Sequence, residues 1–124
     1  MDFLMQANLL VRMAIELELN QPPPSICDEQ ESLNRVRTWL SCYCADGFHA
    51  IQFGKMPILH VDDYLARNSS NWYKTSLLNT PYDVHLCAHV QMIIHMANWN
   101  ASIKAGNPDT NAQVRALLFV IKLY

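Results

Sequence analysis

The sequence predicts an all-α fold, an array of about four amphipathic helices with one irregular connection. Apolar residues recur at intervals of three and four over most of its 124 residues. Two of these stretches begin with a helix-capping pattern, and proline or glycine follows three of them. No strand-like alternation or internal repeat is visible. Because the chain is short and 51% hydrophobic, we expect residues 1–124 to belong to one domain with a real core.

The first helix is expected over residues 2–19. Its apolar positions share one face of a helix and are Phe3, Leu4, Ala7, Leu10, Val11, Ala14, Ile15 and Leu17. The run Pro22–Pro24 cannot continue a helix, since proline lacks the backbone N–H and clashes with the preceding turn. We therefore expect the helix to end by Asn20.

The second helix is expected over residues 29–52. Asp28 and Glu31 have the spacing of a capping box, in which acidic side chains accept hydrogen bonds from free backbone N–H groups of the first turn. Gly47 lies within the apolar face and costs about 1 kcal/mol of helix propensity relative to alanine. Close approach of another helix would offset that cost.

From residue 53 to residue 80 the helical pattern breaks down, and Asp62 is expected to cap a short turn there. A third helix is expected over 81–105, where Pro81 suits the first helical position. A fourth is expected over 110–123. Because helices with apolar faces lie at both ends, we expect the chain to be part of a larger helical domain.

The charge pattern argues against direct nucleic-acid binding. Nine basic and eleven acidic side chains give a net charge of −2, and the basic residues are scattered along the chain. Glycine-rich phosphate-binding patterns are absent. No apolar run reaches the roughly 20 residues of a membrane-spanning helix. We therefore expect neither nucleic-acid nor membrane contact from this segment.

Residues with metal-binding or catalytic chemistry do not form a complete set. His85 and His89 lie one helical turn apart and are the weak candidates for a zinc site. The spacing of Cys42 and Cys44 does not match a zinc finger, and buried reduced thiols are expected instead. Asp46 and His49 lack a nucleophile and are interpreted as a helix contact. The sequence thus predicts no catalytic residue, no metal site and no cofactor.

Two further groups of residues allow more than one interpretation. Arg35 and Arg37 can bind phosphate or pair with acidic side chains at the edge of the core, and the pairing is favoured. As an alternative to core packing, four side chains can line an apolar cleft between helices that binds a small-molecule effector. These are Trp39, Tyr43, Met92 and Met96.

Two motifs resemble a known family. One is the run from Arg35 to Asp46, followed by Ile51 to Ile58, and the other is the run from Arg12 to Asn20. In this order and at this separation they resemble the middle homology region of fungal-specific transcription factors, the regulators with a six-cysteine binuclear zinc cluster. The positions that match the family pattern are Arg35, Arg37, Trp39, Asp46, Gly54 and Pro57. The sequence departs from that pattern at four positions: Glu18 replaces a glycine, Lys55 an arginine, Met56 a proline, and Gly47 a basic residue.

The resemblance implies a nuclear regulator of RNA polymerase II transcription. Zinc and DNA binding would belong to an amino-terminal cluster that this chain lacks. The partners would be other parts of the transcription factor or co-regulators, and the six matching residues would be structural. Three hypotheses follow, in this order: a regulatory interaction domain, a helical sensor of a small molecule, and a metal-dependent hydrolase built on His85 and His89.

Overall fold

The structure, a computed structural model, describes residues 3–59, 62–104, 115 and 122. Its elements are α1 (Phe3–Glu16), α2 (Glu29–Phe53), α3 (Tyr64–Arg67), the 3₁₀-helix η1 (Trp72–Lys74) and α4 (Pro81–Lys104). Within these residues there is no strand, so the predicted all-α class is confirmed. The helix expected over 110–123 lies outside the described residues, apart from Arg115 and Lys122, which are helical.

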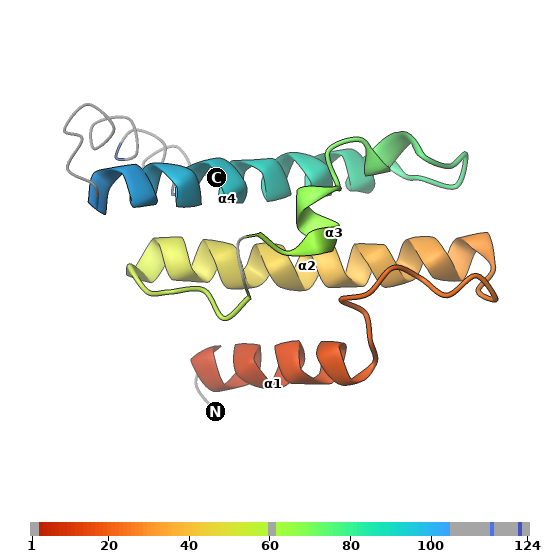
Figure 1. Ribbon diagram of the computed structural model, residues 1–124, viewed down its shortest axis with the longest axis horizontal. Helices are drawn as coiled ribbons and strands as arrows, with labels where there is room; N and C mark the ends of the chain where they lie inside the picture. The colour runs from red at the N-terminus through yellow and green to blue at the C-terminus, as the bar shows by residue number, and fades with distance from the viewer. Residues whose placement is uncertain (1–2, 60–61, 105–114, 116–121, 123–124) are drawn as a thin grey trace.

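Helix α2 lies between the other two long helices (Figure 1). It packs against α1 on one side and α4 on the other, and α3 also contacts it. The chain direction in Figure 1 shows that α1 runs antiparallel to α2, whereas α4 runs parallel to it. A parallel neighbour requires a long connection, and residues 54–80 with α3 and η1 provide one.

The first helix ends at Glu16 rather than at residue 19, because a left-handed residue stops it. Glu18 has φ 58°. Its N–H donates to the Ile15 carbonyl (2.9 Å), and the Leu19 N–H donates to the Ala14 carbonyl (3.0 Å). These two bonds form a Schellman motif, which caps carbonyl groups that have no partner inside the helix. The leucine that follows is buried in the core.

The second helix begins at Glu29 as predicted and ends at Phe53, one residue beyond the expected end. The Asp28 carboxylate accepts from the Glu31 N–H (2.7 Å) and caps the first turn. At the other end Gly54 adopts the left-handed conformation with φ 64°, and the Lys55 N–H donates to the Ala50 carbonyl (2.8 Å). Thus α1 and α2 end in the same motif, once with glutamate and once with glycine at the left-handed position.

The irregular connection contains more helix than the sequence indicated. Asp63 caps α3 by accepting from the Ala66 N–H (3.1 Å). The neighbouring Asp62, which was expected to be the cap, is exposed and pairs loosely with Arg67 (3.4 Å). Both aspartates are compatible with a cap by residue type, so only the backbone path of residues 62–64 decides between them. The short helices α3 and η1 pack on α2 and α4 respectively.

The core lies where α2 meets its neighbours. Trp39, Leu40 and Val90 are at most 1% exposed there. Gly47 faces Ile93 of α4 so closely that an added Cβ would lie 2.8 Å from the Ile93 Cγ2 atom. The close helix approach that was expected to offset the cost of this glycine is therefore present.

One face of α1 and the residue after its end expose an apolar stripe. Its members recur every four residues, so they share one side of the helix. They are Met5, Leu9, Met13 and Leu17, between 49% and 62% exposed, and they are called the α1 stripe below. Val11 and Ala14 on the opposite side are buried. Within the part of the chain that the structure describes, no helix is long and apolar enough to cross a membrane.

Candidate functional site

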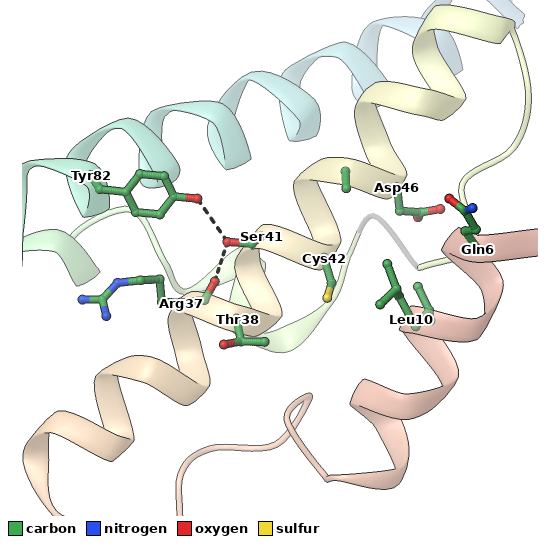
Figure 2. A pocket seen from close by; sticks show the side chains of 10 residues that line it. Gln6, Leu10, Arg37, Thr38, Ser41, Cys42, Asp46 and Tyr82 are labelled. Atoms are coloured by element: carbon green, nitrogen blue, oxygen red, sulfur yellow. Dashed lines mark hydrogen bonds between the residues drawn. The ribbon is translucent and has the colours of Figure 1, made fainter. Parts of the chain in front are cut away.

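The described residues form a groove of about 530 Å³ between α1, α2 and α4 (Figure 2). Its floor is a row of small side chains on α2, spaced so that they share one helix face: Thr38, Ser41, Cys42 and Ala45. Leu10 and Val11 of α1 form one wall, and Tyr82 of α4 contributes to the other. The remaining lining residues are Gln6, Arg37 and Asp46. This set is called the α1–α2–α4 groove.

Arg37 ties α2 to α4 at one edge of the groove. Its Nε and Nη2 atoms donate to the two carboxylate oxygens of Asp83, at 2.6 and 2.9 Å. Its Nη1 atom donates to the Asn34 side chain (2.6 Å), and its guanidinium lies 5.9 Å from the centre of the Trp72 ring. A two-point contact between arginine and carboxylate fixes both distance and orientation, so this pair sets how α4 lies on α2.

Asp83 is fully buried, and every oxygen of its carboxylate is used. Besides Arg37 it accepts from the Asn79 amide (2.9 Å) and from the backbone N–H of Thr80 (3.1 Å). These bonds stabilise the charged form, and the Arg37 bond contributes most, so the pKa of Asp83 is lowered to about 2. Asp83 thus caps the start of α4 through the Thr80 N–H and at the same time is the partner of Arg37.

Trp39 and Asp46, two other residues that match the family pattern, anchor the connection between α2 and α4. The Trp39 indole N–H donates to the Asp63 carboxylate (2.8 Å), which is the same carboxylate that caps α3. The Asp46 carboxylate accepts from the backbone N–H groups of Ile58 (2.9 Å) and Leu59 (2.8 Å). Each side chain on α2 therefore fixes one segment of irregular backbone.

Arg35 and the Gly54–Pro57 turn complete the set of matching positions. The Arg35 Nη2 atom donates to the Leu17 carbonyl at the end of α1 (3.0 Å). Gly54 supplies the left-handed residue that ends α2, and Pro57 lies exposed in the following segment. Taken together, the six positions connect α2 to α1, to α3, to α4 and to its own exit segment.

The four side chains predicted to line one ligand cleft lie in two different places. Met92 and Met96 line a cavity of about 280 Å³ together with His95 and Trp99. Trp39 and Tyr43 line neither that cavity nor the α1–α2–α4 groove, and both are at least 98% buried in the core. Helical spacing places residues on a face, but it does not say whether a neighbouring helix fills the space beside them.

The described histidines and cysteines do not gather into one metal-binding group. His85 is exposed, and the His89 ring packs edge-on against Phe48 with centroids 5.5 Å apart. Among the described residues, no three His, Cys, Asp or Glu side chains gather where they could hold a metal ion. All four thiols are free; burial raises the pKa of Cys44 to about 12, with a smaller contribution from the neighbouring Cys87. A raised pKa keeps a thiol protonated and unreactive.

Sequence reasoning did not identify the groove itself or the interhelix role of Asp83 and Asp63. The row at residues 38, 41, 42 and 45 has helical spacing, which is a signal that could have indicated a second packing face on α2. Nothing local in the sequence pairs Arg37 with an acid 46 positions further on. That pairing depends on the parallel placement of α4.

Comparison with known proteins places these features in a family. Residues 5–69, more than half of the chain, match the family model of the fungal specific transcription factor domain. The chain therefore belongs to this family, which is a transcription-factor domain involved in transcription regulation and is not an enzyme family. The match includes all six of the positions on which the resemblance rests.

A curated relative supports the assignment. Halotolerance protein 9 of Saccharomyces cerevisiae is 29% identical over 72 residues, which cover 55% of this chain and 7% of that protein. The chain thus matches only a small part of the relative's length. No solved structure matches the chain.

Proposed function

We propose that this chain is the regulatory part of a fungal zinc-cluster transcription factor, which acts in the nucleus on transcription by RNA polymerase II. The observation that carries this proposal is the family match over residues 5–69. In this proposal the zinc cluster that binds DNA belongs to another part of the protein. The chain itself, whose net charge is −2, binds neither zinc nor DNA and catalyses no reaction.

The α1 stripe supports a role in protein contacts. Met5, Leu9 and Met13 of this stripe lie on α1, and each is about half exposed. An apolar patch of this kind usually marks an interaction site. We propose that other parts of the same transcription factor, or a co-regulator, cover it and thereby control activation.

A reporter-gene experiment tests this proposal. The chain is inserted between a heterologous DNA-binding domain and an activation domain in yeast, and expression is compared with a fusion that lacks it. We expect the chain to change expression several-fold, and the pair Leu9→Lys with Met13→Lys to abolish that effect. Asn71→Ala, an exposed site on another surface, is the control. Identical expression from the fusions with and without the chain would refute the regulatory role.

A second candidate function is the sensing of a small-molecule effector. The specific observation in its favour is the α1–α2–α4 groove, whose volume of about 530 Å³ is within the range of ligand pockets. Because the groove contacts all three long helices, a bound ligand would stabilise one arrangement of them. Such a ligand would then change which surfaces the domain offers to its partners.

A further inference from the structure

We propose that the α1–α2–α4 groove binds an amphipathic primary amine, with the ammonium group at the hydroxyls of Thr38, Ser41 and Tyr82. This inference rests on the second candidate function, to which it adds a ligand class. Figure 2 shows the groove with the three hydroxyl-bearing residues towards one end and Asp46 towards the other. The argument depends on where the hydroxyl protons are.

All three hydroxyl groups already donate their protons within the protein. Thr38 Oγ1 donates to the Asn34 carbonyl (2.8 Å), and Ser41 Oγ donates to the Arg37 carbonyl (2.8 Å). Ser41 therefore has no proton left for its 3.3 Å contact with the Tyr82 hydroxyl, so Tyr82 is the donor there. Each oxygen consequently offers only lone pairs to a ligand. A ligand group that donates hydrogen bonds fits this end of the groove, and one that only accepts them does not.

The number of hydrogen-bond donors favours an ammonium group over a neutral hydroxyl. Arg37 is neutralised by Asp83, and in Figure 2 its guanidinium points away from Cys42 and Leu10. The Asp46 carboxylate lies at the far end of the groove (Figure 2) and accepts from two backbone N–H groups. Gln6, at the same end, can donate as well as accept. An ammonium group offers three donors and no acceptor and therefore matches the three hydroxyl oxygens, whereas a carboxylate only accepts and does not match them.

The rest of the groove accepts an apolar chain. Leu10, Val11 and Ala45 contribute hydrocarbon surface to the lining. Burial raises the pKa of the Cys42 thiol, which therefore stays uncharged. An alkyl chain attached to the amine can lie along these side chains, between the hydroxyls and Asp46.

Isothermal titration calorimetry with three eight-carbon probes tests the ligand class. The probes are octylamine, octan-1-ol and octanoate, which share the alkyl chain and differ in the polar group. We expect octylamine to bind most tightly, octan-1-ol more weakly and octanoate not at all. Binding of octanoate or octan-1-ol as tight as that of octylamine would overturn the proposal.

Variants of the groove locate the site. Thr38→Val and Tyr82→Phe each remove an accepting oxygen at an exposed position, and each should weaken octylamine binding about tenfold, the effect of one hydrogen bond to a charged group. Ala45→Trp should fill the groove and abolish binding. The matched controls Thr75→Val and Tyr64→Phe, outside the groove, should bind as the parent does.

Unchanged octylamine binding by Ala45→Trp would show that the amine binds elsewhere and would refute the assignment. This measurement needs no gene expression. A failure here therefore leaves the result of the reporter experiment, and with it the regulatory role, intact.

Discussion

At the scale of single residues, the two helix ends differ in how well the side chain suits the backbone. Glu18 and Gly54 both adopt a left-handed conformation, with φ 58° and 64°. A residue with a Cβ atom is strained there, whereas glycine is not. Glu18 stands where the related sequences are expected to carry glycine, so this chain retains a strained residue at the end of α1.

Replacing Glu18 by glycine should therefore stabilise the protein. We expect Glu18→Gly to raise the free energy of unfolding by roughly 1 kcal/mol, since relief of left-handed strain exceeds the entropy that glycine adds to the unfolded chain. Urea denaturation measures the change. Glu18→Ala retains the Cβ atom and should show no such gain; an equal gain from alanine would mean that strain is not the cause.

The buried ion pair makes a pH-dependent contribution to stability. The pKa of Asp83 is lowered from 3.8 to about 2, so the folded state favours the charged form. The contribution is fully present above pH 4 and is lost as the pH falls through 2. Between these values we expect the parent protein to lose about 2 kcal/mol of unfolding free energy from this group.

The variant Asp83→Asn provides the comparison. At pH 7 it should be less stable by about 3 kcal/mol, because it leaves the partly buried Arg37 without its counter-charge. Its stability should then fall less between pH 4 and pH 2 than that of the parent. Denaturation curves recorded at several pH values test this, and parallel pH profiles for the two proteins would contradict the assignment.

At the scale of elements, α2 organises the molecule through three different faces. Its core face packs Trp39 and Leu40, Gly47 allows α4 to approach closely, and the row from Thr38 to Ala45 forms the floor of the groove. The indole N–H of Trp39 and the carboxylate of Asp46 bind the irregular connection between α2 and α4. One helix thus determines both the packing and the position of the candidate site.

The contact between Gly47 and Ile93 predicts that Gly47→Ala destabilises the parent protein but stabilises the Ile93→Ala variant. Gly47→Ala alone should destabilise by about 1 kcal/mol, because the added Cβ overpacks the core more than helix propensity gains. With Ile93→Ala the space becomes free, and the same substitution should stabilise by up to about 1 kcal/mol. A double-mutant cycle measures the coupling. Additive effects would show that the two residues do not compete for space.

At the scale of the whole molecule, the buried apolar residues stabilise the fold, whereas the exposed apolar residues are available for contacts with a partner. The core is shared by the three long helices, whereas the α1 stripe lies outside it. Substitution on one side of α1 should therefore affect folding, and substitution on the other side should affect binding only.

Two variants of α1 test this separation. Val11→Ala, at a position that is 4% exposed, should lower the free energy of unfolding by roughly 2 kcal/mol. The pair Leu9→Lys with Met13→Lys should change it by less than about 1 kcal/mol, since both sites are half exposed. Thermal unfolding followed by circular dichroism distinguishes them. A large loss of stability in the lysine variant would mean that the stripe belongs to the core.

The sequence alone determined the all-α class, the capping of α2 by Asp28, the end of α2 to within one residue and the family resemblance carried by residues such as Arg37 and Trp39. These are local features, since capping, periodicity and motif spacing involve residues a few positions apart. Only the tertiary structure decided that Arg37 pairs with Asp83, that Trp39 and Tyr43 fill the core rather than a cleft, and that the groove lies beside Ser41. Those properties depend on which helix faces meet across the long connection, and local sequence patterns do not specify that arrangement.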